Sequence, residues 1–378
     1  MAHCVLTSRD LLREMGAYQS GCYADLLPFL RLLQSTTPRY FRLSDHGAFH
    51  ALLEPWRSVF SIDRFVRAKP EWASYVLSYA AIYGKVELLA DLHAQGHFVN
   101  DEIVWALAAE HGHVSIFAFL ARIVCDPYTA TAMTHAAKYN QLAVVRFLDS
   151  HFGPWRNRWP LTTACNHGHV DVARYLYAHS DGASVPNLMR GAAMHGHLAV
   201  LAFLHESGYA HCSTLEMDMA ASHGHVDVVR YLHTHRGEGC TMRAMDLAAM
   251  HGHLDVVQFL HQHRIEGCTT DAMDSAASEG HLKVVQFLHE HRGEGCTTDA
   301  MDGAAMHGHL DIVHFLHEHR REGCSTSAMD GAAIYGHTDV LVFLSEKRHE
   351  GCSDAARAYA AKHQPPHIVR LLNTPRPS

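Results

Sequence analysis

The chain has 378 residues, of which 48% are hydrophobic and 19% charged, and its 39 acidic and 31 basic residues give a net charge of −8 at pH 7 with histidine neutral. This balance argues against general nucleic-acid binding, which needs concentrated lysine and arginine to displace counterions from phosphates. No apolar stretch approaches the roughly 20 residues of a transmembrane helix, and charges interrupt the start, "MAHCVLTSRDLLREMG", where a secretion signal needs an apolar run. We expect no membrane association and no secretion, and a cytoplasmic or alternatively nuclear protein.

Residues 1–70 lack the repeat that follows them. The segment "SRDLLREMGAYQSGCYADLLPFLRLLQ" predicts two amphipathic helices around a Ser-Gly turn, and an aromatic-rich stretch continues to about Pro70. We favour an N-terminal helical cap that shields the apolar face of the first repeat. The alternative is a module that couples substrate-binding repeats to a ubiquitin-ligase core, because the spacing of eight residues is faintly similar to an F-box: Leu11, Leu12, Met15, Tyr18, Ala24, Leu26, Leu27 and Leu30. The Leu-Pro opening of the F-box is absent.

From residue 71 onward the sequence repeats every 28 residues without insertions. Alanine holds one place of the period in all eleven copies (Ala80 to Ala360), and leucine holds another in all eleven (Leu92 to Leu372). A fixed period of this length predicts stacked supersecondary units, each too small to fold alone. We assign residues 71–373 to one repeat array and residues 374–378 to a short tail.

The copy that begins at Cys268 shows that each unit contains two short helices. Met273 and Ala276 share one face of the first helix, which Gly280 ends. Gly295 in the turn to the next unit can adopt a positive φ. The second helix has an apolar inner face: Val284, Val285, Phe287 and Leu288.

The string "AAxxGHLxVVxFL", as in Ala248–Leu260, resembles the ankyrin repeat over about residues 71–373. Two departures stand out. The usual Thr-Pro-Leu-His opening is replaced by words such as "DAMD" (Asp271–Asp274), and the unit is five residues shorter than the usual 33. The missing residues belong to the connection that carries a β-hairpin in ordinary ankyrin repeats. We therefore predict an all-α, ankyrin-like solenoid of about eleven helix-turn-helix units with short turns between them.

The resemblance also implies a function, because ankyrin arrays bind other proteins and are rarely enzymes. It implies a non-enzymatic, monomeric scaffold that binds partner proteins through the concave side, which is formed by the first helices and the turns. The variable places on that side are those of Asp271, Ser275, Ser278 and Glu279. The partner-binding candidates at the Ser278 place are Met194, Met250, Ser278 and Met306.

A second group of candidates lies in the early units, which are individual and aromatic where the later units are near copies, and the region from Trp105 to Trp159 is the best local candidate for the binding site. Tryptophan and arginine dominate interface hot spots. The alternative is that the tryptophans fill gaps between irregular units. The candidates of this group are Trp105, Tyr128, Trp155, Arg156, Arg158 and Trp159.

Histidine occurs 36 times and forms two periodic sets. The resemblance implies that the histidine after each repeat glycine donates a hydrogen bond to the backbone of an adjacent turn. The second set is a His-x-His pair near the end of each late second helix, such as His261 and His263. Residues i and i+2 lie ~200° apart on a helix and cannot hold one ion together, so we predict no metal site. The further alternative is an array that responds to metal or pH, because burial lowers a histidine pKa.

Three other ladders follow the same period. The carboxylates are predicted to accept hydrogen bonds along first helices, with histidine as the suggested partner, or alternatively to form an acidic stripe: Asp218, Asp246, Asp274, Asp302 and Asp330. The methionines are predicted to fill the core: Met189, Met217, Met245, Met273, Met301 and Met329. The cysteines are predicted to be free thiols in a reducing compartment: Cys212, Cys240, Cys268, Cys296, Cys324 and Cys352.

Catalysis needs one singular constellation of groups, whereas an array offers the same environment several times. The sequence contains no nucleophile–base pair, phosphate loop or cofactor fingerprint that we can identify. We therefore expect no catalytic residues, no enzyme activity and no cofactor.

Overall fold

The computed structural model describes residues 24–33, 43–125, 127–153, 157–179 and 184–373. Within these ranges every regular element is helical, and no strand occurs. No helix in the described ranges is long and apolar enough to cross a membrane. The prediction of an all-α protein is confirmed.

The chain forms two compact units. Unit 1 comprises residues 1–164 and 171–182, and unit 2 comprises residues 165–170 and 183–378. The boundary that we predicted at residue 70 differs from this division, because it separates the repeat array from the segment before it. It stays a prediction.

Among the described residues, five elements precede the repeats in unit 1: η1 (Ala24–Leu26), α2 (Leu27–Leu33), α3 (Leu43–Arg57), α4 (Ile62–Ala68) and η3 (Pro70–Trp72). Their core is aromatic. Phe29, Phe49 and Phe65 contact one another edge to face, with ring centroids 5.0–6.2 Å apart. The cluster extends into η3 and the first repeat, because Phe65 packs on Trp72 and Phe49 packs on Tyr79. The first of the two predicted N-terminal helices falls within residues 1–23, which lie outside the described ranges.

Eleven helix pairs follow, as the period predicts. The first helices are α5 (Ala73–Tyr83), α7 (Glu102–Glu110), α9 (Thr129–Lys138), α11 (Trp159–Asn166), α13 (Leu188–Met194), α15 (Thr214–Ser222), α17 (Met242–Met250), α19 (Asp271–Ser278), α21 (Thr298–Met306), α23 (Thr326–Tyr335) and α25 (Asp354–His363). The second helices are α6 (Val86–Ala94), α8 (Val114–Ile123), α10 (Leu142–Phe152), α12 (Val170–His179), α14 (Leu198–Glu206), α16 (Val226–His235), α18 (Leu254–His263), α20 (Leu282–His291), α22 (Leu310–His319), α24 (Thr338–Lys347) and α26 (Pro366–Asn373).

The pair α19–α20 follows its sequence pattern closely. Met273 and Ala276 are buried on the inner face of α19, and Gly280 ends the helix with a φ of +84°. Gly295 in the next turn has a φ of +79°, a backbone conformation that other residues rarely adopt. Phe287 differs from the prediction, because it is only half-buried and its ring contacts His261 of the preceding pair.

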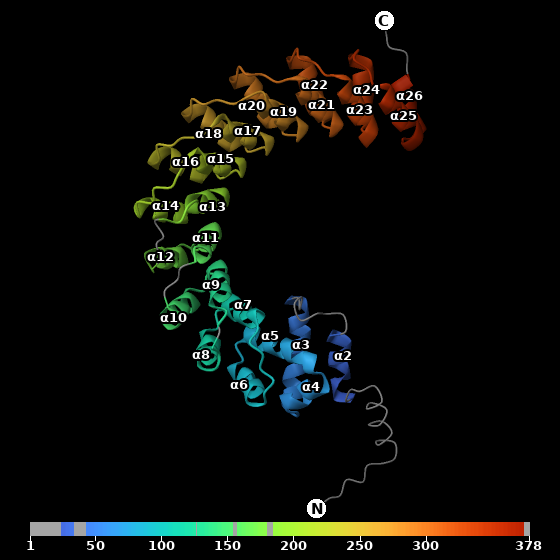
Figure 1. Ribbon diagram of the computed structural model, residues 1–378. Coiled ribbons are helices and arrows are strands. Elements are labelled where there is room, and N and C mark those ends of the chain that lie inside the picture. The colour runs from blue at the N-terminus through green and yellow to red at the C-terminus, as the bar shows by residue number, and fades with distance from the viewer. Residues whose placement is uncertain (1–23, 34–42, 126, 154–156, 180–183, 374–378) are drawn as a thin grey trace, which may run out of the picture. The chain divides into compact units, whose positions relative to one another are not determined.

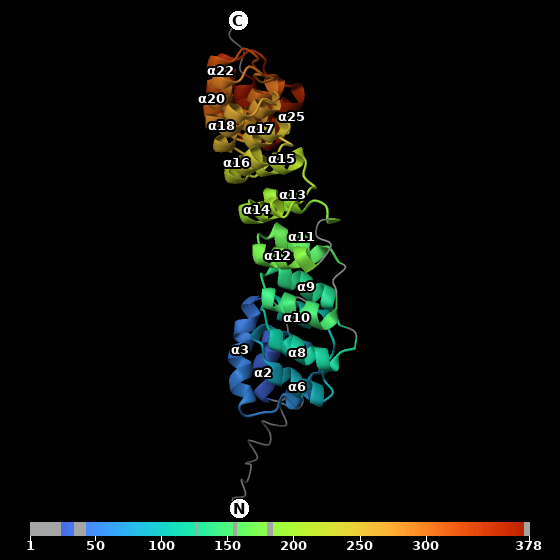
Figure 2. The same ribbon diagram turned by 90° about the vertical axis from the view of Figure 1, so that its left-hand side faces the viewer.

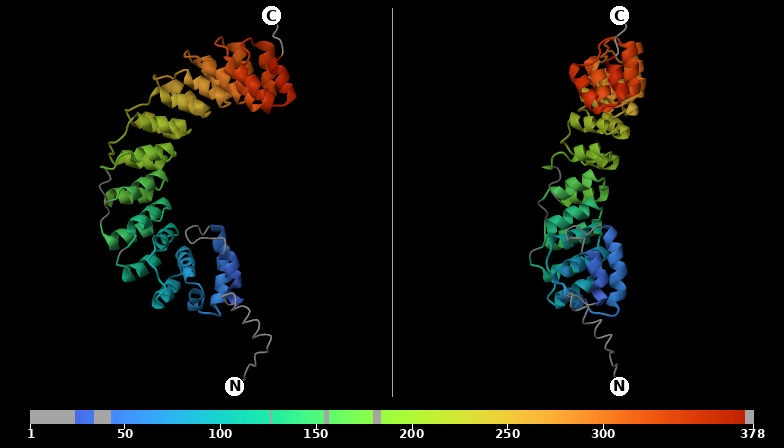
Figure 3. Two further views of the ribbon diagram at one scale, coloured as in Figure 1. Left: turned by 45° about the vertical axis from the view of Figure 1, so that its right-hand side comes forward. Right: turned by 90° about the vertical axis from the view of Figure 1, so that its right-hand side faces the viewer.

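The helix pairs of unit 2 stack on one another in chain order (Figure 1). Neighbouring first helices pack along most of their length, whereas neighbouring second helices meet over fewer residues. The first helices therefore form the closely packed side of the stack. Figure 2 shows α15–α18 from another side. Short turns without hairpins join one pair to the next (Figure 3). Unit 2 is an ankyrin-like helical solenoid of the predicted kind.

The periodic methionines and thiols lie in the core of this stack. All six methionines of the ladder are at most 7% exposed, which confirms their predicted role as core filling. The six periodic cysteines are free, and all except the half-buried Cys212 are buried. Burial raises the pKa of the Cys268 thiol to about 11, so this thiol is protonated at neutral pH.

Candidate interaction surface

The histidine after each repeat glycine ties neighbouring units together through their backbones. Nε2 of His113 lies 2.7 Å from the carbonyl oxygen of Ile82, and Nε2 of His225 lies 3.1 Å from that of Met194. A carbonyl oxygen only accepts, so Nε2 carries the hydrogen in both cases. The implied role of these imidazoles is confirmed, and they belong to the scaffold that holds the surface in place.

Glutamine makes the same bond in two units that lack the Gly-His dipeptide. The amide nitrogen of Gln141 donates to the carbonyl of Glu110 at 2.9 Å, and that of Gln364 donates to Ile334 at 2.7 Å. The turn therefore requires a side-chain N–H donor that reaches back to the preceding unit, and not an imidazole in particular.

The aspartate ladder also links successive units. The carboxylate of Asp246 accepts from the backbone N–H of Thr269 at 2.8 Å and from its hydroxyl at 3.0 Å. Each of these aspartates thus contacts the residue that begins the next first helix, and the other pairs are Asp218 with Thr241, Asp274 with Thr297, Asp302 with Ser325, and Asp330 with Ser353. The predicted acceptor role is confirmed, but the partner is threonine or serine and not histidine. Burial raises the pKa of Asp218, which is 2% exposed and offers no acidic stripe to a partner.

Replacing Asp246 with alanine is expected to lower the free energy of unfolding by about 1–3 kcal/mol, because the two donors of Thr269 lose their acceptor. The shift of the urea unfolding midpoint measures this loss. The matched control is Glu290→Ala on the outer side of α20, where the side chain is 65% exposed and a change within about 0.5 kcal/mol is expected. Equal effects of the two substitutions would show that the inter-unit bond contributes nothing.

The variable residues of unit 2 gather at the ends of the first helices. We define the inner row as the two residues before each repeat glycine: Met194 and His195, Ser222 and His223, Met250 and His251, Ser278 and Glu279, Met306 and His307, Ile334 and Tyr335. Met194 is 37% exposed and Tyr335 is 64% exposed. The row follows the first helices of the stack from α13 to α23, so one elongated partner can contact several units at once.

Two of the predicted candidates in this row have a second role. Gly303 and Gly331 allow the next first helix to approach closely, since an added Cβ would lie 2.7 Å from the Cβ of Ser278 and 2.8 Å from that of Met306. Ser278, Met306 and also Met250 are half-buried. At the Ser278 and Met306 places the row therefore supplies both accessible surface and packing between units.

The exposed histidines of the inner row were not singled out from the sequence, although their place, that of Glu279, was recognised as variable. Nδ1 of His195, His223 and His251 lies 2.8–3.0 Å from a carbonyl oxygen four residues earlier in the same helix. Nδ1 therefore carries the hydrogen, and Nε2 keeps a lone pair that can accept a hydrogen bond from a partner. The signal that could have identified them is the "HGH" word, in which the second imidazole belongs to the scaffold.

Trp105 of unit 1 is a core residue. Its side chain is fully buried, its indole N–H donates to Asn100 at 2.9 Å, and its ring contacts Phe117 and Phe152. This burial agrees with the alternative that early tryptophans fill gaps, and it removes Trp105 from the candidates.

The other early candidates that the structure describes lie at the beginnings of their helices. Tyr128 is 39% exposed at the beginning of α9, and Trp159 is 59% exposed at the beginning of α11, with the Arg158 guanidinium 5.9 Å from its ring centroid. They sit at the opposite end of the first helices from the places that form the inner row. Trp155 and Arg156 lie outside the described residues.

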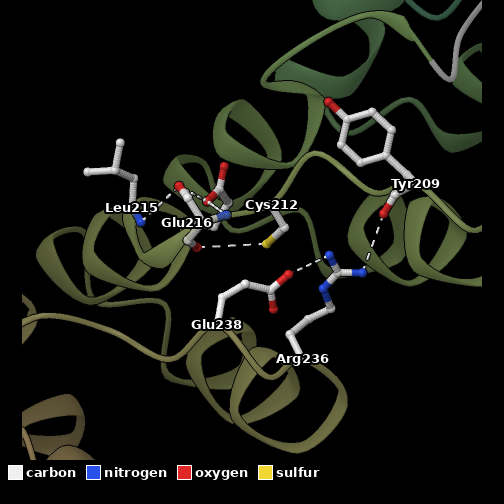
Figure 4. Close-up of polar contacts among 7 residues, drawn as sticks. Tyr209, Cys212, Leu215, Glu216, Arg236 and Glu238 are labelled. Atoms are coloured by element: carbon white, nitrogen blue, oxygen red, sulfur yellow. Dashed lines mark hydrogen bonds and ion pairs between the residues drawn. The ribbon is translucent and has the colours of Figure 1, made fainter.

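The turns after the second helices carry a repeated polar cluster (Figure 4). Arg236 pairs with Glu238 at 2.7 Å and donates to the backbone carbonyl of Tyr209 in the preceding unit at 3.4 Å. The same pair recurs as Arg264 with Glu266, Arg292 with Glu294, Arg320 with Glu322 and Arg348 with Glu350. Among the described residues no three His, Cys, Asp or Glu side chains are grouped as ligands for a metal ion.

Comparison with known families agrees with this architecture. The ankyrin repeat family matches residues 156–190, and the family of ankyrin repeats in many copies matches residues 191–233 and 245–289. No curated protein matches the chain. Ankyrin repeats are generally protein–protein interaction modules and are typically not enzymes. With its 28-residue helix pairs, Gly-His turns and family matches, the chain contains ankyrin repeats within residues 156–289.

Proposed function

We propose that the protein is a non-enzymatic, monomeric scaffold that binds one or more partner proteins along the inner row of unit 2. The observation that carries the proposal is the contrast between two sets of residues. The alanines, glycines and inter-unit hydrogen bonds repeat from unit to unit, whereas the inner row varies and keeps accessible side chains such as Met194 and Tyr335. A fixed scaffold with a variable accessible row suits recognition of an extended surface.

The chemistry of the row supports an apolar partner segment with hydrogen-bond donors. Thioether and aliphatic side chains alternate along the row with imidazoles whose Nε2 atoms accept hydrogen bonds. Tyr128, Arg158 and Trp159 are further candidates in the early repeats, and Arg158 lies beside the Trp159 ring. The free thiols support a reducing compartment, such as the cytoplasm, as the place of action.

Affinity capture from lysate with mass spectrometry tests this proposal. The inner-row variant Met194→Ser/Met250→Ser/Tyr335→Ser is expected to lose specific partners that the wild-type chain retains. The control Gln262→Ser/Glu290→Ser changes exposed residues of the second helices and is expected to keep them. Retention of all partners by the inner-row variant, or the same loss in the control, would place binding elsewhere.

For the N-terminal region we propose a cap that completes the first repeat. The Tyr79 hydroxyl in α5 lies 2.8 Å from Glu54 and 2.7 Å from Nδ1 of His50, both in α3, and Lys85 pairs with Glu54 at 3.1 Å. Together with the contact between Phe49 and Tyr79, these bonds join α3 to the first helix pair. A shared core of this kind is what a cap requires.

The alternative is a substrate adaptor of a ubiquitin ligase, which would use the F-box-like residues. Leu11, Leu12 and Met15 lie outside the described residues. The variant Leu11→Ala/Leu12→Ala/Met15→Ala is expected to capture the same proteins as the wild-type chain if the region is only a cap. Capture of ligase components by the wild type and their loss in this variant would favour the adaptor.

A further inference from the structure

A row of histidines lies between the second helices of unit 2. We define the outer histidine ladder as His233, His261, His289 and His317, the first histidine of each late His-x-His pair. Each ring contacts a phenylalanine of the next unit nearly at right angles, with centroids 5.3–5.6 Å apart: Phe259, Phe287, Phe315 and Phe343. The first three also contact the second histidine of the next unit at 5.6–5.7 Å: His263, His291 and His319. The ladder is thus part of each interface between units.

The ring nitrogen Nδ1 of each ladder histidine faces this interface and has no hydrogen-bond acceptor beside it. Nδ1 of His233 lies 3.5 Å from Nη1 of Arg264, and a guanidinium only donates, so this Nδ1 holds a lone pair. In His261, His289 and His317, Nδ1 is buried and has no hydrogen-bond partner. A proton added to Nδ1 would be buried without an acceptor, and in His233 it would face an arginine.

The charged neighbours of the ladder come from both sides of each interface. His233 is faced by Arg264, His263 and Glu266, and His261 by Arg292, His291 and Glu294. Glu266 and Glu294 favour protonation of the histidines, but each glutamate is already paired with the arginine beside it. Around His317 the charged groups are Arg348, Lys347, His314 and Glu318. Around His289 they include His319 and, by the repeat, the Arg320–Glu322 pair. The cations therefore outweigh the anions that are free to compensate a new charge.

We propose that the outer histidine ladder makes the stacking of unit 2 acid-sensitive, so that protonation of these imidazoles weakens several unit–unit contacts together. Because the stability of a repeat array depends on its interfaces, equal losses at neighbouring interfaces add along the stack. The inference concerns the stability of the stack and does not depend on which partner the inner row binds.

The direction of the pH effect follows from the pKa shifts. Burial lowers the pKa of His233, His261 and His317, and the adjacent arginines lower it further. A lowered folded-state pKa means that the stabilisation is present above the unfolded value of about 6.5 and is lost as the pH falls through the folded pKa. Burial lowers the pKa of the Gly-His residues His253 and His309 too, so they act in the same direction.

The aspartate ladder acts in the opposite direction. Burial raises the pKa of these groups: Asp218, Asp246, Asp274 and Asp302. A raised folded-state pKa means that these carboxyl groups become less destabilising as the pH falls through that pKa. The window from about pH 7.5 to 5.5 brackets the ordinary histidine pKa. The ladder variant keeps all of these carboxyl groups, so its difference from the wild type reports the imidazoles.

Thermal unfolding of the full chain at pH 7.5, 6.5 and 5.5 tests the proposal. The ladder variant replaces His233, His261, His289 and His317 with leucine, and the matched control replaces four exposed histidines whose ring contacts lie away from the ladder with glutamine: His151, His179, His223 and His235. We expect Tm of the wild type and of the control to fall on acidification. We expect the ladder variant to lose less than half as much, with the remainder due to the Gly-His residues.

An equal fall of Tm in the ladder variant and the wild type, or no fall in the wild type, would overturn the proposal. Should the fourfold variant not fold, imidazole NMR of the wild-type chain gives an independent test, with assignment from the single variants His233→Gln, His261→Gln and His317→Gln. Titration midpoints below about 6.5 for these three residues agree with the proposal, and midpoints at or above that value contradict it.

Discussion

Replacing Met273 with alanine is expected to lower the free energy of unfolding by about 2–5 kcal/mol. Met273 is 1% exposed on the inner face of α19, where the neighbouring core residue Ala276 is too small to fill the space that the longer side chain occupies. The loss therefore combines the transfer of a buried side chain with the cavity that remains. Urea unfolding followed by circular dichroism measures it.

The control for this prediction is Met242→Ala in the first turn of α17. Met242 is 47% exposed, so its truncation is expected to change the free energy of unfolding by no more than about 0.5 kcal/mol. If the two methionines proved equally tolerant of alanine, the methionine ladder would not be the core of the stack.

Gly196→Ala is expected to cost about 1.5–3.5 kcal/mol, because two effects act at the same position. Gly196 has a φ of +75°, which costs an alanine about 1–2 kcal/mol. The added Cβ would also lie 2.6 Å from Nδ1 of His225, whose Nε2 bonds the carbonyl of Met194. Displacing this ring breaks that exposed hydrogen bond, at about 0.5–1.5 kcal/mol.

Two other glycines of unit 2 separate the backbone cost from the loss of the hydrogen bond. Gly208 has a φ of +72° and nothing within 4 Å of an added Cβ, so Gly208→Ala reports the backbone cost alone. Gly237 has neither constraint, and its substitution is expected to be nearly neutral. If Gly196→Ala cost no more than Gly208→Ala, the hydrogen bond of His225 would not stabilise the junction between units.

Much of the fold could be predicted because its determinants are local and periodic. The turn glycines, the alanines of the first helix and the apolar set of the second helix specify a helix pair within one 28-residue unit. Repetition of that unit specifies stacking, so the core positions of Met273 and its equivalents followed from spacing alone. The short connections followed from the five residues that each unit lacks relative to the usual ankyrin repeat.

The contacts between units were harder to predict, because they join residues 23 to 31 positions apart whose relation depends on how one pair sits on the next. Asp246 was recognised as an acceptor, but its donor, Thr269, lies just before the following first helix. His261 was seen on the sequence as one of an i, i+2 pair, whereas its contacts, Phe287 and His291, belong to the next unit. Trp105 carries no sequence signal that separates a buried indole from an exposed one.

The central claim, that the inner row of unit 2 contacts a partner protein, is tested most directly by site-specific photo-crosslinking in cells. A photoreactive amino acid at the place of Met250 in the inner row is compared with the same group at Gln262 on the outer side of the next helix. We predict that the Met250 position forms a discrete covalent adduct with another protein and that the Gln262 position does not. Adducts that form equally at both positions, or only at Gln262, would contradict the assignment of the inner row as the binding surface.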